Sequence, residues 1–111
     1  MIKLNNANIT GSDFDDVNLS GTRFDNVNLS ASSFHYATMK GSGFDDINLS
    51  QCRFNNIRAE AVRFTRVNLS GAVLKDCCLK NVVIDGSELE GMTIEGIAVS
   101  ELLDSYRRHN P

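Results

Sequence analysis

Residues 14–34 read FDDVNLSGTRFDNVNLSASSF, with a large apolar residue at every fifth position. The same register continues from Leu4 to Ile94, and the only small residue that it meets at this position is Ala59. A period of five fits neither the 3.6-residue period of an amphipathic helix nor the two-residue period of a strand. The chain must therefore turn every few residues, which indicates a repeat architecture.

The residue two places before each large apolar residue is small or aliphatic and never charged, as at Val17, Thr22 and Val27. Side chains two residues apart lie on the same side of an extended segment. Each five-residue unit is therefore predicted to turn two side chains inward and three toward solvent. Large central residues follow small partners, as close packing of a narrow interior requires.

A second period of twenty residues lies on the first. Its clearest members are the triplets Asn28-Leu29-Ser30, Asn48-Leu49-Ser50 and Asn68-Leu69-Ser70. Twenty residues hold four units, so we expect four units in each coil and about five coils in the chain. Successive coils should lie about 4.8 Å apart, the ordinary spacing of paired strands, with like residues stacked.

This pattern resembles that of the pentapeptide-repeat family, whose unit is Ala-(Asp/Asn)-Leu-x-x. The resemblance covers residues 2 to about 96 and implies an all-β fold, a right-handed quadrilateral parallel β-helix. The position before the central residue departs from Asp or Asn in several units, for example at Arg23, Arg53 and Arg63. Those units should lose a local side-chain hydrogen bond without a change in the interior.

The repeat register ends near Ile94, so residues 1–96 are predicted to form the β-helix and residues 97–111 a strand, a turn and a capping helix of the same domain. Thr93 to Val99 should form a strand turned at Gly96. Ser100 is the expected N-cap. Apolar residues at helical spacing should then lie across the open last coil.

Leu102, Leu103 and Tyr106 are the candidate residues for this cap or for a dimer contact. An uncovered coil end exposes backbone edges that invite pairing. We therefore expect a homodimer through one end of the solenoid, and dimers through the C-terminal end resemble those of some family members.

The residues argue against an enzyme, and no catalytic, cofactor or metal site is predicted. His35 and His109 are far apart in the sequence, and Cys52, Cys77 and Cys78 do not form a ligand cluster. The odd number of cysteines and the lack of an apolar leader predict a cytoplasmic protein. No membrane segment is predicted. The net charge of −3 predicts no direct binding to nucleic acid.

Charge is distributed in bands along the chain, with a net charge of −3 over residues 1–46, +4 over 47–80 and −4 over 81–111. The candidate acidic interaction face consists of Asp15, Asp16, Asp25, Asp45, Asp46 and Asp85. The candidate basic belt consists of Arg53, Arg58, Arg63 and Arg66.

Two functions fit these bands. One is a non-enzymatic scaffold whose flat faces bind a protein partner that the sequence does not name. The alternative comes from the resemblance, because some pentapeptide-repeat proteins mimic duplex DNA and bind the type II topoisomerases DNA gyrase and topoisomerase IV. The basic belt interrupts the continuous negative stripe that such a mimic needs.

Overall fold

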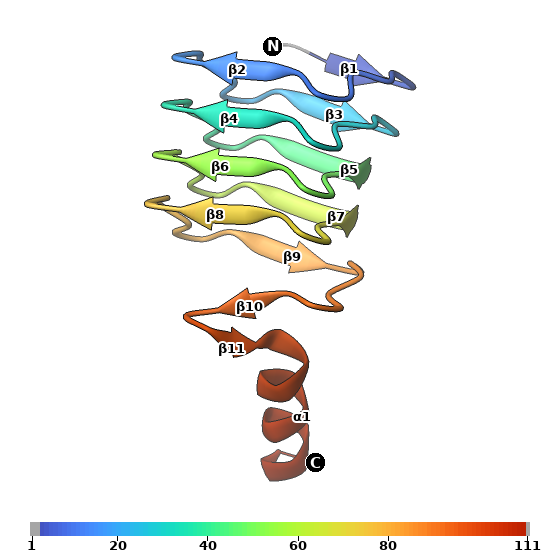
Figure 1. The fold of residues 1–111 in the computed structure, drawn as a ribbon, viewed down its shortest axis with the longest axis vertical. Helices are drawn as coiled ribbons and strands as arrows, with labels where there is room; N and C mark the ends of the chain where they lie inside the picture. The colour runs from blue at the N-terminus through green and yellow to red at the C-terminus, as the bar shows by residue number, and fades with distance from the viewer. Residues whose placement is uncertain (1–2, 111) are drawn as a thin grey trace.

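The computed structural model describes residues 3–110, and the chain winds into a solenoid that ends in one helix (Figure 1). One parallel sheet consists of β1 (Lys3–Asn5), β3 (Arg23–Asp25), β5 (Gly43–Asn48), β7 (Arg63–Asn68) and β9 (Val83–Asp85). The other consists of β2 (Asp13–Asp15), β4 (Ser33–His35), β6 (Arg53–Asn55) and β8 (Val73–Lys75). We name their outer surfaces the first and third faces.

Shorter contacts form the second and fourth faces between these sheets. Single parallel bridges join Asn8 to Asn28 and Asn28 to Asn48 on the second face, and Asn18 to Thr38 on the fourth. Every parallel pairing joins residues twenty apart, as in the pair Phe24 and Phe44. The prediction of a parallel β-solenoid with four units in each coil is therefore confirmed. The regular stack makes about four turns rather than five, because the last turn leaves it.

The core is a stack of like side chains, as the twenty-residue period predicts. Phe24 and Phe44 stack at 4.6 Å between ring centroids, and Phe44 and Phe64 at 5.2 Å. A second row joins Phe14, Phe34 and Phe54 at 4.7 Å for each pair. Aromatic rings with centroids about 4.5–7 Å apart contribute about 0.5–1.5 kcal/mol for each pair beyond the burial of their area.

Small polar residues fill the space beside the rings. The Ser42 hydroxyl donates a hydrogen bond to the carbonyl of Leu19, 2.6 Å away in the preceding coil. The thiol of Cys52 donates in the same way to the carbonyl of Leu29. The hydroxyl of Thr22 is buried without a hydrogen-bond partner among residues 3–110. These bonds connect successive coils through the interior as well as through the sheets.

The solenoid's corners require a left-handed backbone. The last residue of each unit has a positive φ, for example +59° at Ala61 and +72° at Gly71. Glycine adopts this region without strain, whereas a residue with a Cβ atom is strained there. Gly43 is different, because it lies in strand β5 and its φ is not positive.

The last turn ends in an antiparallel hairpin of β10 (Thr93–Ile94) and β11 (Ile97–Ala98), followed by helix α1 (Val99–His109). The predicted turn at Gly96 and the C-terminal helix are confirmed. The predicted N-cap is wrong, because Ala98 holds that position without a side-chain bond and Ser100 lies inside the helix. No helix in residues 3–110 is long and apolar enough to cross a membrane.

The expected position of the helix is also wrong. Helix α1 packs on β11 and continues away from the coils instead of lying across the last one (Figure 1). The amide of Val99 donates to the carbonyl of Met92, and Val99 is the buried residue of the helix. This anchoring directs the helix outward from its first residue.

Candidate functional site

The second face has no charged side chain on its first four rungs, which are residues 8–10, 28–30, 48–50 and 68–70. Each rung shows solvent one asparagine and one serine or threonine, with a buried or half-buried aliphatic residue between them. The charges of this face are those of Glu88 and Glu90, both on the last rung. Charged residues are depleted at the centres of protein interfaces, so this is one candidate binding surface.

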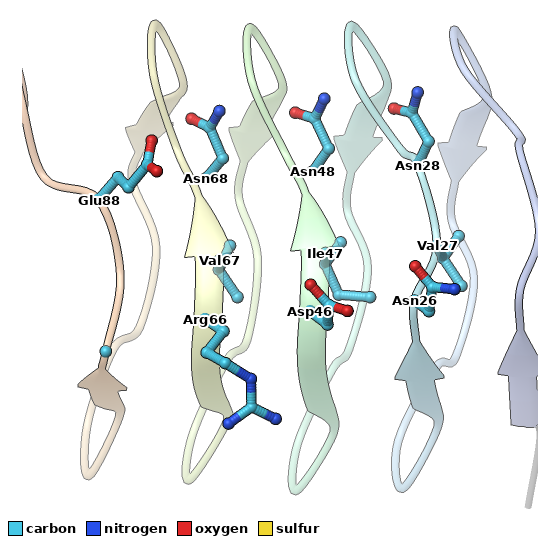
Figure 2. A pocket seen from close by; sticks show the side chains of 11 residues that line it. Asn26, Val27, Asn28, Asp46, Ile47, Asn48, Arg66, Val67, Asn68 and Glu88 are labelled. Atoms are coloured by element: carbon cyan, nitrogen blue, oxygen red, sulfur yellow. The ribbon is translucent and has the colours of Figure 1, made fainter.

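Local hydrogen bonds hold the asparagines in identical orientations. Asn48 Oδ1 accepts from the amide of Ser50 at 2.9 Å, and Asn28 and Asn68 make the same bond two residues along the chain. Such a side-chain turn satisfies the amide oxygen and leaves its NH₂ group toward solvent. Figure 2 shows these three amides in one row, which Glu88 continues. The row offers uncharged donors at the spacing of the coils.

A groove of about 520 Å³ lies beside this row. Its other side is the corner between the first and second faces, formed by Asn26, Asp46, Arg66 and Gly86. Val27, Ile47 and Val67 lie between the two rows with their side chains buried, so the floor is largely backbone. The groove can hydrogen-bond a polar partner, and it contains no pair of groups arranged for acid–base chemistry.

The structure distributes the predicted acidic residues over two faces. Asp25 and Asp45 are in register on the first face, and Asp85 continues their column after an interruption at Thr65. Asp46 lies at the adjoining corner. Asp15 and Asp16 belong to the unit of β2 on the third face.

The predicted basic residues lie on three faces. Arg63 lies in β7 on the first face and Arg66, in the same strand, at the corner that follows this face, while Arg53 lies in β6 on the third face and Arg58 on the fourth. Arg66 forms an ion pair with Asp45 in the acidic column, and both side chains are largely exposed. An exposed pair of this kind contributes little to stability, but it removes the separation between acidic and basic surfaces here.

The third face contains an imidazole close to a carboxylate. Nδ1 of His35 lies 3.7 Å from Oδ1 of Asp15, and its ring lies 4.1 Å from that of Tyr36. Residues 3–110 contain no group of three His, Cys, Asp or Glu side chains placed to bind a metal ion. Burial raises the pKa of the Cys52 thiol to about 11 and that of Cys77 above its usual value, so neither is an activated nucleophile.

The C-terminal end exposes apolar residues that a complete further coil would cover. A cavity of about 290 Å³ opens between the fourth coil and β10, lined mainly by apolar side chains that include Leu74, Ile84 and Met92. Ile94 at its rim is 50% exposed, and Tyr106 on the helix is 65% exposed. Of the predicted cap residues, Leu103 is half-buried while Leu102 and Tyr106 are exposed. Exposed apolar residues that gather at one end of a protein can mark a contact with another protein.

The prediction of candidate residues missed the asparagine row and Gly43. The Asn-x-Ser triplets at intervals of twenty contained the signal for the row, because four units in each coil place them directly above one another. Gly43 carried a signal as well, because the other seven glycines occupy positive-φ turn positions.

The chain folds into a parallel β-solenoid with flat, mainly polar faces, and no recognisable catalytic cluster lies in residues 3–110. The profile of the pentapeptide repeat region matches residues 2–74, and the chain belongs to this family. The resemblance inferred from the five-residue register is thereby confirmed. No curated protein sequence matches this chain.

Several solved structures share the fold. HetL, a pentapeptide repeat protein involved in heterocyst differentiation regulation in the cyanobacterium Nostoc, has a TM-score of 0.73 and 19% identity, over 84% of this chain and 43% of HetL. A thylakoid-lumen protein of Arabidopsis thaliana has a TM-score of 0.63 and 18% identity, over 92% of this chain and 75% of that one.

QnrB1, a plasmid-mediated fluoroquinolone resistance protein, has a TM-score of 0.55 and 17% identity, over 79% of this chain and 53% of QnrB1. The chain thus spans less than half of the length of HetL and about half of that of QnrB1. At such identities the likeness concerns the fold alone.

Proposed function

We propose that this chain is a non-enzymatic protein-binding scaffold that pairs with a second copy through its C-terminal end and leaves its flat faces free for a partner. The uncovered apolar end carries this proposal. Ile84, Ile94, Leu102 and Tyr106 are all exposed on the last turn and the helix. Burying them against another protein removes apolar area from water, which is the main driving force of stable association.

The charges of helix α1 suit pairing with a copy of itself. Glu101 lies in its first turn, and Arg107 and Arg108 lie in its last turn. Two such helices side by side and antiparallel bring the acidic start of each near the basic end of the other. A contact related by a two-fold axis needs this self-complementarity.

Light scattering after gel filtration tests the pairing. The wild-type chain should elute as a dimer of the 12.2 kDa protomer, and Tyr106→Glu should weaken the dimer by at least about tenfold. Tyr36→Glu is the matched control, because Tyr36 is 58% exposed on the third face and lies away from this end. A wild-type monomer at tens of micromolar, or a dimer unaffected by Tyr106→Glu, contradicts the proposed pairing.

The second face is the proposed surface for a different protein partner. Ser50→Arg adds charge and bulk to the middle of the asparagine row and keeps the bond between the Ser50 amide and Asn48. Ser20→Arg is its control on the fourth face, where the Ser20 amide makes the same bond to Asn18 at 3.0 Å. Partners recovered from lysate by the wild type should be lost with Ser50→Arg and retained with Ser20→Arg. Loss with both variants would contradict a role of the second face.

The register of Asp25 with Asp45 favours mimicry of DNA as a second candidate function. The Cα trace of the rod is 27 by 22 Å in cross-section, close to the width of a duplex, and QnrB1 shares the fold. The test is protection of DNA gyrase from a fluoroquinolone in a supercoiling assay. If the chain mimics DNA, the wild type should protect gyrase, and the triple change of Asp25, Asp45 and Asp46 to Asn should remove this protection. A wild-type chain that gives no protection excludes DNA mimicry.

A further inference from the structure

Gly43 is a glycine that the fold does not require. Its φ is not positive, and a Cβ atom added to it would meet no atom within 4 Å. It lies in β5, the middle strand of the five-stranded sheet, where glycine destabilises the folded chain relative to alanine. Glycine in the interior of a strand often marks a place where a ligand or another backbone comes close.

Two arginines flank this glycine. Gly43 pairs in register with Arg23 of β3 on one side and with Arg63 of β7 on the other. The Cα atoms of the two arginines therefore lie about 9.6 Å apart, twice the spacing of strands. Both side chains are exposed, and neither forms an ion pair with a residue of the described part of the chain. Two long guanidinium side chains can thus approach one anionic group from both sides of the glycine.

A hollow of about 390 Å³ lies on the first face, with Arg23, Gly43 and Arg63 along one side. Asp25 and Asp45 lie along the other side, each two residues further along its strand. The hollow therefore has a cationic side and an anionic side. Residues two apart on one face of a strand are about 6.6 Å apart, and an extended partner segment repeats this distance.

We propose that this hollow binds an extended segment of a protein partner in which a Glu or Asp is followed two residues later by a Lys or Arg. The acidic side chain lies over Gly43 between Arg23 and Arg63. The basic side chain contacts Asp25, which forms no ion pair within residues 3–110, and lies beside Asp45, which is paired with Arg66. The inference rests on the proposed scaffold function and assigns to the scaffold a further binding surface, on the first face, with its own recognition chemistry. Opposite charges in matching positions give such a contact its specificity.

Titration of the ¹⁵N-labelled protein with the peptide GTETKTG tests the site by NMR. The amide signal of Gly43 should shift on titration, and GTQTQTG should leave it unchanged. Arg23→Gln and Arg63→Gln should each weaken binding by about tenfold or more, because each removes a charged hydrogen-bond donor. Arg53→Gln is the matched control, since Arg53 is exposed at the same repeat position of the third face and pairs in register with Ser33 and Val73.

Gly43→Val separates binding from folding. Valine favours a strand, and its Cβ atom would meet no other atom within 4 Å, so the melting temperature should rise while the peptide no longer binds. Full binding by Gly43→Val would overturn the proposal, as would a wild-type protein whose Gly43 signal does not respond to GTETKTG. The dimer and the second face are measured without this peptide, so their failure is distinguishable from failure of this site.

Discussion

Replacing Phe44 with alanine tests how the stacked core stabilises the solenoid. Phe44 is 1% exposed, and its ring stacks at 4.6 Å on Phe24 and at 5.2 Å on Phe64. Removal of a buried phenylalanine ring costs about 3–5 kcal/mol, of which each aromatic pair contributes about 0.5–1.5 kcal/mol. Since domains are commonly stable by only about 5–15 kcal/mol, this single change should bring the chain close to unfolding.

Phe14→Ala is the matched comparison, because it removes a phenylalanine ring at the end of a stack instead of in the middle of one. Phe14 is half-buried in the first coil and, among residues 3–110, stacks on Phe34 alone, so its loss should cost about half as much. Urea unfolding followed by circular dichroism measures both free energies. Equal losses at the two positions would refute the view that contacts between neighbouring coils carry the stability.

Four further changes probe the interior and the corners by urea unfolding. Thr22→Val should raise the free energy of unfolding by about 1 kcal/mol, because it removes a buried hydroxyl without a hydrogen-bond partner. Ser42→Ala should lower the free energy of unfolding, because it removes the hydrogen bond to Leu19. No gain in stability for Thr22→Val would contradict this account. Ala61→Gly should stabilise the chain by about 1 kcal/mol, since φ is +59° at Ala61, and a loss of stability would show that the corner is not strained. Burial raises the pKa of the Cys52 thiol from 9.0 to about 11, so its contribution to stability is complete below pH 9 and is lost as the pH rises to 11. The free energy of unfolding of Cys52→Ala should therefore decline less than that of the wild type between pH 9 and pH 11. An identical decline in both proteins would contradict the assignment.

The solenoid could be predicted because its determinants are local and repeated. The two inward-facing residues of each unit, such as Val27 and Leu29, can be recognised within the unit itself. Steps of twenty residues then place similar pairs above one another. The position of helix α1 could not be predicted in this way. The spacing of Leu102 and Tyr106 identifies an apolar stripe, but the direction of the helix depends on the hairpin and on the bond between Val99 and Met92.

The candidate binding surfaces were predictable only in part. The bands of charge describe consecutive residues along the chain, whereas a partner would contact one face of the solenoid. Each face consists of every fourth unit, so it combines residues from more than one band. Arg63 and Asp45 are eighteen residues apart in the sequence and yet border the same hollow. The twenty-residue register contains this arrangement once residues are grouped by face instead of by position along the chain.

The uniform step of twenty residues also makes the length of this rod adjustable. A gain or loss of one whole coil moves everything beyond it along the axis by about 4.8 Å and leaves each face in line. A change of a single five-residue unit instead turns all later units by one face, so that the asparagine row would continue beneath a charged column. Sequence variation in steps of twenty can therefore lengthen a recognition surface one rung at a time, while steps of five divide it.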